Sequence, residues 1–386
     1  MWFSSFFRKD TRELVALVDI GPSSCGGAIV RYEEGKRPHI LWIGERVEIK
    51  NSSSRDTVYK ATANLLEEMS AECRIRGFST PTHVSCALSP TFYSGKTECV
   101  QKRFDSPQEI TQKLLDTLAR DVIQEAGKDF VLIDEQITRV RLNGYTMKSP
   151  LGKKAAQIDL DFYWSAAPRT FVDMVRACIH SAFPRSTIEL HTFSFLSFII
   201  LRDILHEEVE FISLTISPDT TTVSLVRAGR LISIFSYPFG QRMLVSLVAE
   251  ELRTIPEESE VILRLYGENK VTDDIRARVR RACIPAETQW RKRLLEILEA
   301  ASFQSSLPQK LFILGEAGQM ALFKEFISGL DAAHLTLRTQ PFSCQTIPLP
   351  VLAAYVDESP NALAKRDLFL LLESIAFSRI HAKKNI

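Results

Sequence analysis

The sequence lacks the patterns that would assign a simple chemistry. Its seven cysteines are scattered without a Cys-x-x-Cys pair, so reduced thiols are expected instead of a disulfide framework or a zinc site. The seven histidines are dispersed too, and no His-Glu-x-x-His pattern occurs. Lysine plus arginine (48) balances aspartate plus glutamate (47), so no basic field indicates a nucleic-acid partner.

Long apolar runs are also absent. No stretch reaches the ~20 apolar residues that a membrane span needs, and the most apolar run, residues 192–201, predicts a buried helix. The first ten residues, MWFSSFFRKD, have no extended apolar core or cleavage site of a signal peptide. Their aromatic spacing leaves two interpretations open, a tail docked on its own domain or a contact with a membrane surface or partner. These aromatic residues are Trp2, Phe3, Phe6 and Phe7.

A repeated segment gives the first positive signal. The chain has 386 residues, enough for two or more domains with sizeable cores. Residues 19–31, DIGPSSCGGAIVR, align without a gap on residues 215–227, TISPDTTTVSLVR, at a constant offset of 215 − 19 = 196. An apolar strand precedes each copy and a polar turn follows it. The pattern predicts two related α/β domains, each opening with a strand–turn–strand unit.

The succession of strand and helix patterns along the chain predicts four parts. We expect a first domain over residues 12–81 and 164–209, an inserted αβ subdomain over 82–163, a second domain over 210–245 and 308–386, and a mostly helical subdomain over 246–307. Within the insert, SPQEITQKLLDTLARDVIQEA predicts a helix that begins with Ser106 as N-cap, Pro107 at the first position and Glu109 as the capping-box acid.

Three segments with small residues in their turns carry a family resemblance. They are VDIGPSS at residues 18–24, SPDTTTVSLVRAGRLI at 217–232 and LFILGEAGQM at 311–320. They resemble the first phosphate hairpin, the second phosphate hairpin and the adenosine loop of the actin-like ATPase superfamily, and most of all of its FtsA-type cell-division and PilM-type pilus-assembly members. The resemblance implies an α/β, actin-like (ribonuclease-H-like) fold of two duplicated domains, with the insert in the place of the SHS2-type subdomain of FtsA and PilM.

The resemblance also implies a nucleotide site. A nucleotide site needs glycines and hydroxyls where the backbone approaches phosphate oxygens closely, and a carboxylate that positions the metal ion. Asp19 would hold Mg²⁺ through water, so the implied cofactor is ATP with Mg²⁺. The corresponding residues here are Asp19, Gly21, Ser23, Ser24, Thr220, Thr221, Glu260, Gly315 and Gly318.

Several positions depart from the family pattern. Pro22 removes a backbone donor from the first turn, and Thr215 stands where the second hairpin has an aspartate. Asp219 brings a negative charge to the second turn, and Leu263 replaces the lysine near Glu260. We therefore expect a pseudo-ATPase in which nucleotide binding is weak or lost, with ATP/Mg²⁺ or no cofactor. Under the alternative structural interpretation, the hydroxyls merely cap turns.

The resemblance implies a cytoplasmic adaptor or scaffold, peripheral at the inner face of the bacterial cell membrane, in cell division or pilus assembly. Its partners would be the tail of a tubulin-like division protein or of a pilus-assembly membrane protein, and it could self-associate. The alternative is an active ATPase or small-molecule kinase of the same fold. Arg276 and Arg280, in the basic run at residues 273–298, are either a partner contact or part of a solvated helix face. Residues 359–386 are either a core-packed helix or a membrane-targeting one.

Overall fold

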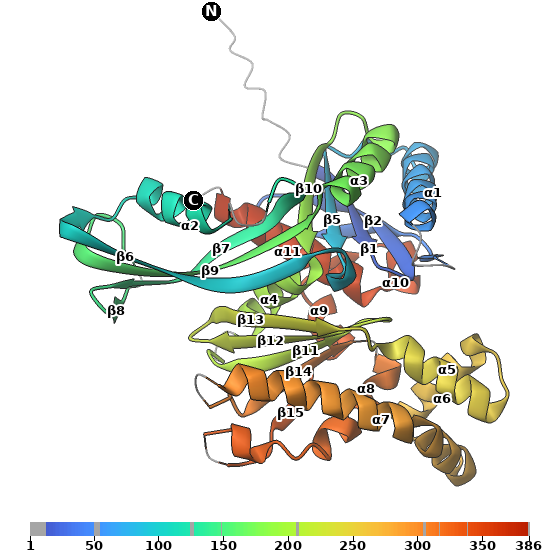
Figure 1. Ribbon diagram of the computed structural model, residues 1–386. Helices are drawn as coiled ribbons and strands as arrows, with labels where there is room; N and C mark the ends of the chain where they lie inside the picture. Colours follow the sequence, from blue (N-terminus) through green and yellow to red (C-terminus); the bar gives the residue numbers. More distant parts are fainter. Residues whose placement is uncertain are drawn as a thin grey trace, which may run out of the picture. The chain divides into compact units, whose positions relative to one another are not determined.

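The computed structural model describes residues 13–49, 55–123, 127–147, 149–205, 208–303, 306–315, 317–337 and 339–384. The chain divides into two compact units, each of which is described by itself (Figure 1). Unit 1 comprises Met1–Ala87, Met174–Leu190 and Leu352–Ile386, and unit 2 comprises Leu88–Asp173 and His191–Val351.

A sheet with the strand order β10-β5-β1-β2-β3-β16 organises unit 1, and β4 pairs with β2. Its strands are β1 (Glu13–Ile20), β2 (Ser24–Tyr32), β3 (His39–Ile43), β4 (Val47–Glu48), β5 (His83–Leu88), β10 (Thr187–Thr192) and β16 (Asp357–Glu358). Its helices are α1 (Arg55–Ile75), the later part of α3 (Arg169–Ala182), α10 (Pro360–Ala364) and α11 (Leu368–Lys384). The central strand β1 is buried almost throughout, which suits its run of branched apolar residues.

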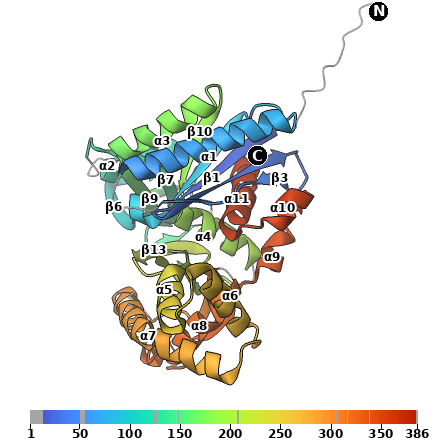
Figure 2. The ribbon, with the colours of Figure 1, turned by 90° about the vertical axis from the view of Figure 1, so that its right-hand side faces the viewer.

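Two neighbouring glycines of β2 show how helices cover this sheet. A side chain at Gly27 would meet Met69 of α1, whereas one at Gly26 would meet Leu370 of α11. Successive residues of a strand point to opposite faces, so α1 and α11 cover opposite faces of the sheet. Figure 2 shows the strands between these two helices.

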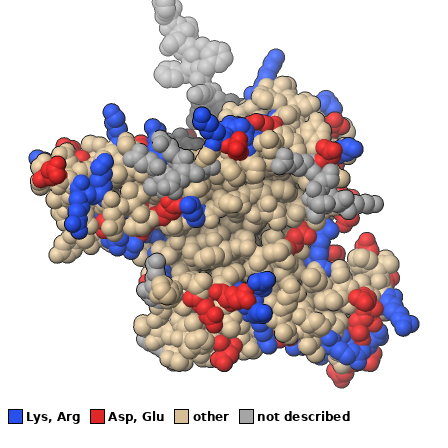
Figure 3. Space-filling model, viewed as in Figure 1, with Lys and Arg blue, Asp and Glu red and all other residues tan. Residues whose placement is uncertain are grey.

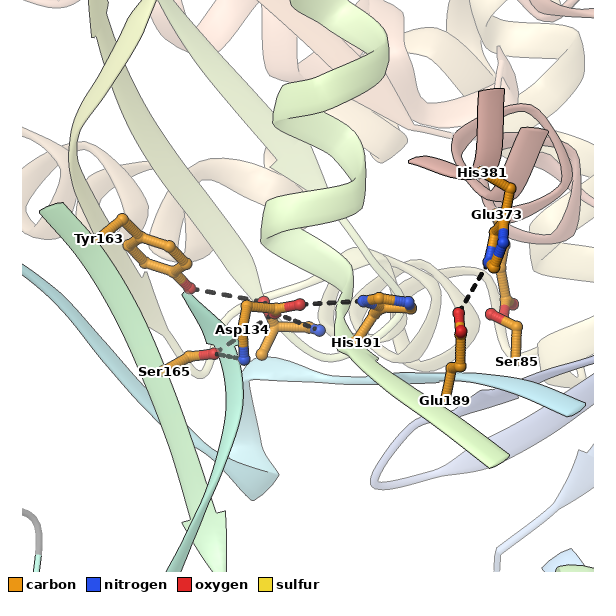
Figure 4. Close-up of polar contacts among 9 residues, drawn as sticks. Ser85, Asp134, Tyr163, Ser165, Glu189, His191, Glu373 and His381 are labelled. Carbon is orange, nitrogen blue, oxygen red and sulfur yellow. Dashed lines mark hydrogen bonds and ion pairs between the residues drawn. The ribbon is translucent and has the colours of Figure 1, made fainter. Parts of the chain in front are cut away.

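The C-terminal residues lie in unit 1, which differs from the predicted boundaries. We expected residues 352–386 in the second domain, but β16 pairs with β3 and α11 packs on β1 and β2. Tyr32 Oη donates to the Ser374 carbonyl at 2.9 Å. Ser85 Oγ donates to Glu373 at 3.2 Å (Figure 4). The physical reason is that the apolar surface of α11 is buried by the first sheet.

The interpretation of the tail as a core-packed helix is confirmed. All apolar side chains from Leu368 to Phe377 are buried, on every side of the helix. A helix that is apolar all round is expected inside a core.

The sheet of unit 2 that carries the second hairpin has the order β13-β12-β11-β14-β15. Its strands are β11 (Phe211–Ile216), β12 (Thr221–Arg227), β13 (Arg230–Tyr237), β14 (Lys310–Gly315) and β15 (Ser343–Thr346). The associated helices are α4 (Phe193–Ile204), α5 (Gln241–Leu252), α6 (Pro256–Gly267), α7 (Asp273–Ser302), α8 (Ala317–Ser328) and α9 (Leu349–Ala353). The apolar faces of α5, α6, α7 and α8 and the strands β11 and β14 meet in one buried cluster.

The two predicted hairpins have the same strand register. In the first, β1 and β2 are antiparallel with Asp19 opposite Gly26. In the second, β11 and β12 are antiparallel with Thr215 opposite Thr222. Each residue of the second pair lies 196 positions after its counterpart (215 − 19 and 222 − 26). The predicted duplication is therefore confirmed at the level of backbone pairing.

The insert forms a sheet of its own in unit 2, with the order β6-β9-β7-β8. Its elements are β6 (Ser94–Glu109), α2 (Gln112–Ile123), β7 (Phe130–Leu142), β8 (Tyr145–Thr146) and β9 (Lys154–Pro168). The predicted helix start was wrong, because β6 continues to pair with β9 as far as Glu109. Thr111 Oγ1 instead accepts from the Leu114 N–H at 3.2 Å, and α2 begins after it. Apart from residues 352–386, the four-part division of the chain stays a prediction.

The most apolar run forms a buried helix, as predicted. Every residue of α4 from Phe193 to Leu201 is buried. Among the described residues, no helix is both long and apolar enough to cross a membrane.

Candidate functional site

The first hairpin has a tight turn after Asp19. The Gly21 N–H donates to the Ser24 carbonyl at 2.9 Å, which closes the turn between β1 and β2. A Cβ atom at Gly21 would lie only 2.9 Å from that same carbonyl oxygen, so glycine is required by close approach. The Ser23 carbonyl is occupied as well, because it accepts from the Ile49 N–H at 2.7 Å.

Arg46 fills the mouth of this hairpin. Its Nη2 donates to Asp19 Oδ2 at 2.5 Å, its Nε to Ser24 Oγ at 3.1 Å, and its Nη1 to Asp367 Oδ2 at 2.7 Å. A guanidinium suits this task because its planar fork can serve two carboxylates and a hydroxyl together. Asp19 and Ser24, two residues implied in metal and phosphate binding, are thus joined by an internal cation.

The electrostatics of the cluster follow from burial and mutual charge. Burial raises the pKa of Asp19 above its usual value, and Arg46 opposes that effect. Burial by itself would lower the pKa of Arg46, but Asp367 and Asp19 outweigh it and raise that pKa. Arg46 therefore remains a permanent positive charge beside Asp19.

Asp367 links the hairpin to α11. Its Oδ1 accepts from the backbone N–H groups of Phe369 at 2.8 Å and Leu370 at 3.1 Å, so it caps the helix start. The other carboxylate oxygen receives Arg46. The arginine thus connects the end of β1 with the start of a core helix.

The second hairpin is closed by the start of α5. The Gln241 N–H donates to the Ser217 carbonyl at 3.1 Å, and the Arg242 N–H donates to the Pro218 carbonyl at 2.9 Å. A Cβ at Gly240 would lie 2.4 Å from both carbonyl oxygens, so only glycine permits this approach. Helix N-terminal N–H groups commonly bind anions, but here they bind the chain's own turn. The side chain of Asp219 lies 3.9 Å from Arg242 Nε.

The hydroxyls of the second hairpin have internal partners. Thr220 Oγ1 lies 2.8 Å from Ser217 Oγ, which also accepts from the Thr220 N–H at 3.1 Å. Thr221 Oγ1 donates to the Phe239 carbonyl at 2.7 Å and accepts from Trp290 Nε1 at 3.0 Å. Both threonines are buried. These contacts are the local capping role that the alternative interpretation predicts.

Helix packing occupies the glycines of the implied adenosine loop. A Cβ at Gly318 would lie 3.1 Å from both Cα and Cβ of Arg264, so α6 and α8 touch at backbone distance. A Cβ at Gly315 would lie 2.5 Å from the terminal methyl of Met320. Glu260, the implied base contact, is exposed on α6. The glycines thus have a packing role, and nucleotide contact at these residues stays a prediction.

The two arginines of the implied contact surface have partners within the chain. The Arg276 guanidinium lies 4.9 Å from the centre of the Tyr266 ring. Arg280 donates to Glu287 at 3.0 Å and lies 3.5 Å from Glu325. On the face shown in Figure 3, basic and acidic side chains are mixed. The arrangement favours the solvated helix face, and a partner contact stays a prediction. The predicted aromatic contacts, Trp2, Phe3, Phe6 and Phe7, lie outside the described residues.

Comparison with known proteins shows the fold. A chain of a PilM–PilN type IV pilus biogenesis complex is similar, with a TM-score of 0.62 and 17% identity, over 96% of this chain and 97% of that chain. EutJ from Carboxydothermus hydrogenoformans is less similar, with a TM-score of 0.43 and 12% identity over 88% and 86% of the two chains. No protein-family model and no curated protein matches the sequence.

The chain therefore has the predicted actin-like fold. More particularly, its fold is that of the chain in the PilM–PilN complex, along nearly the whole length of both. Arg46, Asp367, Gly240 and Trp290 are the site residues that the sequence did not reveal.

Proposed function

We propose that this protein is a PilM-like adaptor that works in type IV pilus assembly through contacts with other proteins. The observation that carries the proposal is the likeness in fold to a chain of a PilM–PilN complex over 96% of this chain. PilN is the partner named in that complex, so we propose a pilus-assembly membrane protein as the partner here. The adaptor would lie in the cytoplasm, peripheral at the inner face of the cell membrane.

We further propose that the adaptor does not turn over ATP. Hydrolysis needs a metal ion, stabilisation of the developing charge and an oriented water. Asp19 is the residue implied for the metal ion, and it is bound to Arg46 at 2.5 Å. The turn carbonyls of the second hairpin take up the N–H groups at the start of α5. These internal contacts support weak or lost nucleotide binding.

Hydrolysis of Mg-ATP by the purified full chain tests the proposal against its enzymatic rival. We expect no turnover above the background of a matched Asp19→Ala variant. Turnover by the natural chain that Asp19→Ala abolishes would replace the adaptor proposal with an actin-like ATPase. A sugar or other small-molecule acceptor that stimulates such turnover would indicate a kinase.

Partner choice is tested by calorimetry with two peptides. One is the cytoplasmic segment of the PilN-type protein from the same genome, and the other is the C-terminal tail of its tubulin-like division protein. We expect saturable binding of the first peptide and none of the second. Binding of the tail alone, with loss of that binding in an Arg276→Ala/Arg280→Ala variant, would place the protein in cell division instead.

A further inference from the structure

One end of the inserted sheet is built from turns. There Arg103 of β6 pairs with Gln157 of β9 on one side, and Asn143, which follows β7, binds β9 on the other side. The Asn143 N–H donates to the Gln157 carbonyl at 2.9 Å, which fixes the turn after β7 against β9. We call the described residues of 102–113 and 143–154, which form this end, the insert tip.

A tight turn of the insert tip exposes a tyrosine. Asn143 and Gly144 have positive φ values of 49° and 86°. They join Leu142 of β7 to Tyr145 of β8, which pair directly, as in a type I′ hairpin. Leu142 is buried in the core of the insert, whereas Tyr145 is 76% exposed. The backbone thus holds an aromatic side chain outside the core on a rigid turn.

A second turn exposes a leucine at the same end. The Lys153 N–H donates to the Pro150 carbonyl at 3.3 Å, and Gly152 has a φ of 75°, as in a type II turn. The Gly152 N–H donates to the Ile110 carbonyl at 2.9 Å, so the turn is fixed just before α2. Ile110 is buried, but Leu151 is 53% exposed. One exposed apolar side chain is ordinary, whereas two on fixed turns at one end of a subdomain indicate a contact surface.

The insert tip also carries exposed cations that have no ion-pair partner among the described residues. They are Lys102, Arg103, Lys113, Lys153 and Lys154. Two exposed carboxylates, Asp105 and Glu109, lie in the same segments, so positive charge exceeds negative charge at this end. Figure 3 shows basic side chains, with some acidic ones among them, at the end of the insert where Figure 1 labels β6 and β8. A surface of this charge attracts an anionic partner.

We propose that the insert tip binds the surface of a membrane that contains anionic phospholipids. Lysine and arginine side chains are attracted to such a surface within about a Debye length. Tyrosine suits the boundary between headgroups and acyl chains because its ring is apolar and its hydroxyl is polar, and leucine adds apolar area that can be buried there. Four of the five cations are lysines, whose flexible point charges suit a fluid layer of phosphates.

The exposed Tyr145 and Leu151 favour a lipid surface over a nucleic acid. Non-specific binding to nucleic acid needs positive charge alone, whereas binding to a bilayer surface combines charge with buried apolar area. The inference goes beyond the proposed function, because it concerns lipid and needs no partner protein. A contact of this size is weak by itself, and it adds to the attachment that a membrane-bound partner provides.

Co-sedimentation of the full chain with vesicles tests the proposal. We expect binding to vesicles of phosphatidylcholine with phosphatidylglycerol, none to phosphatidylcholine alone, and weaker binding at high NaCl. Lys153→Gln with Lys154→Gln should weaken binding about 25-fold, since each lysine near an anionic surface contributes about five-fold. Lys60→Gln with Lys292→Gln is the matched control, because it removes two exposed lysines of α1 and α7, and it should bind as the natural chain does.

A second variant separates a lipid surface from other anionic partners. Tyr145→Ser with Leu151→Ser keeps every charge, and we expect about ten-fold weaker vesicle binding because partial burial of two apolar side chains is lost. No binding to the anionic vesicles, or binding that the Lys153 and Lys154 changes leave unaltered, would overturn the proposal. Duplex DNA is the other probe, and lysine-dependent binding of DNA without vesicle binding would overturn it too. None of these outcomes affects the calorimetry with the PilN-type peptide, so the two proposals can fail separately.

Discussion

Replacing Arg46 is the strongest test of whether its side chain fills the first hairpin. Arg46→Met removes the positive charge that the buried Asp19 and the partly buried Asp367 share, and leaves both carboxylates without it. Breaking a buried ion pair costs about 3–5 kcal/mol. Because the Arg46 side chain is 24% exposed, we expect the lower end of that range, about 3 kcal/mol.

The loss should depend on pH in a defined direction. Burial raises the pKa of Asp19 above 3.8, and without Arg46 this rise is no longer opposed. A carboxyl with a raised pKa in the folded state binds protons more tightly when folded, so its contribution is present below 3.8 and is lost as pH rises through the folded pKa. The deficit of Arg46→Met should therefore be small in acid and reach full size near neutrality.

Urea unfolding of the natural chain and of the Arg46→Met variant, from below pH 3.8 to neutrality, measures the effect. Lys365→Met is the control, because Lys365 pairs with the exposed Glu45, and we expect it to cost less than about 1 kcal/mol. An Arg46→Met deficit no larger than that of the control, or one independent of pH, would refute the reasoning.

Three smaller changes test other contacts of the site and the insert. Gly240→Ala places a Cβ 2.4 Å from two carbonyl oxygens, and we expect a loss of about 1–3 kcal/mol in urea unfolding. Trp290→Phe removes the donor to Thr221 at 3.0 Å and should cost about 1–3 kcal/mol by calorimetry, whereas a neutral result would show that the bond is dispensable. Thr111→Ala removes the cap of α2 and should cost about 1 kcal/mol, with faster exchange in its first turn, whereas the same effect from Ser106→Ala would restore the predicted start.

The fold was predictable where local patterns repeat. The two hairpins share apolar strands and small-residue turns at an offset of 196, and their backbone registers agree at Asp19 and Thr215. The apolar run that forms α4 was also predictable from composition. By contrast, the signature at Ser106 predicted a helix start that does not form, because β6 pairs with β9 as far as Glu109. Long-range strand pairing here overrides local capping preference.

The filling of the site could not be predicted in the same way. Arg46 is separated from Asp19 by 27 residues and from Asp367 by 321, and no sequence pattern connects them. Trp290 is 69 residues from its acceptor Thr221. Such contacts depend on how distant segments fold together. The departures at Pro22 and Thr215 indicated a weakened site, but they did not show which groups occupy it.

Binding of Mg-ATP to the full chain, measured by titration calorimetry, tests the central claim most directly. With Arg46 bound to Asp19 and the second turn closed by α5, we expect no saturable heat at physiological nucleotide concentrations. Saturable binding that Asp19→Ala abolishes would contradict the account, because it would show that the hairpins still hold a nucleotide and its metal ion.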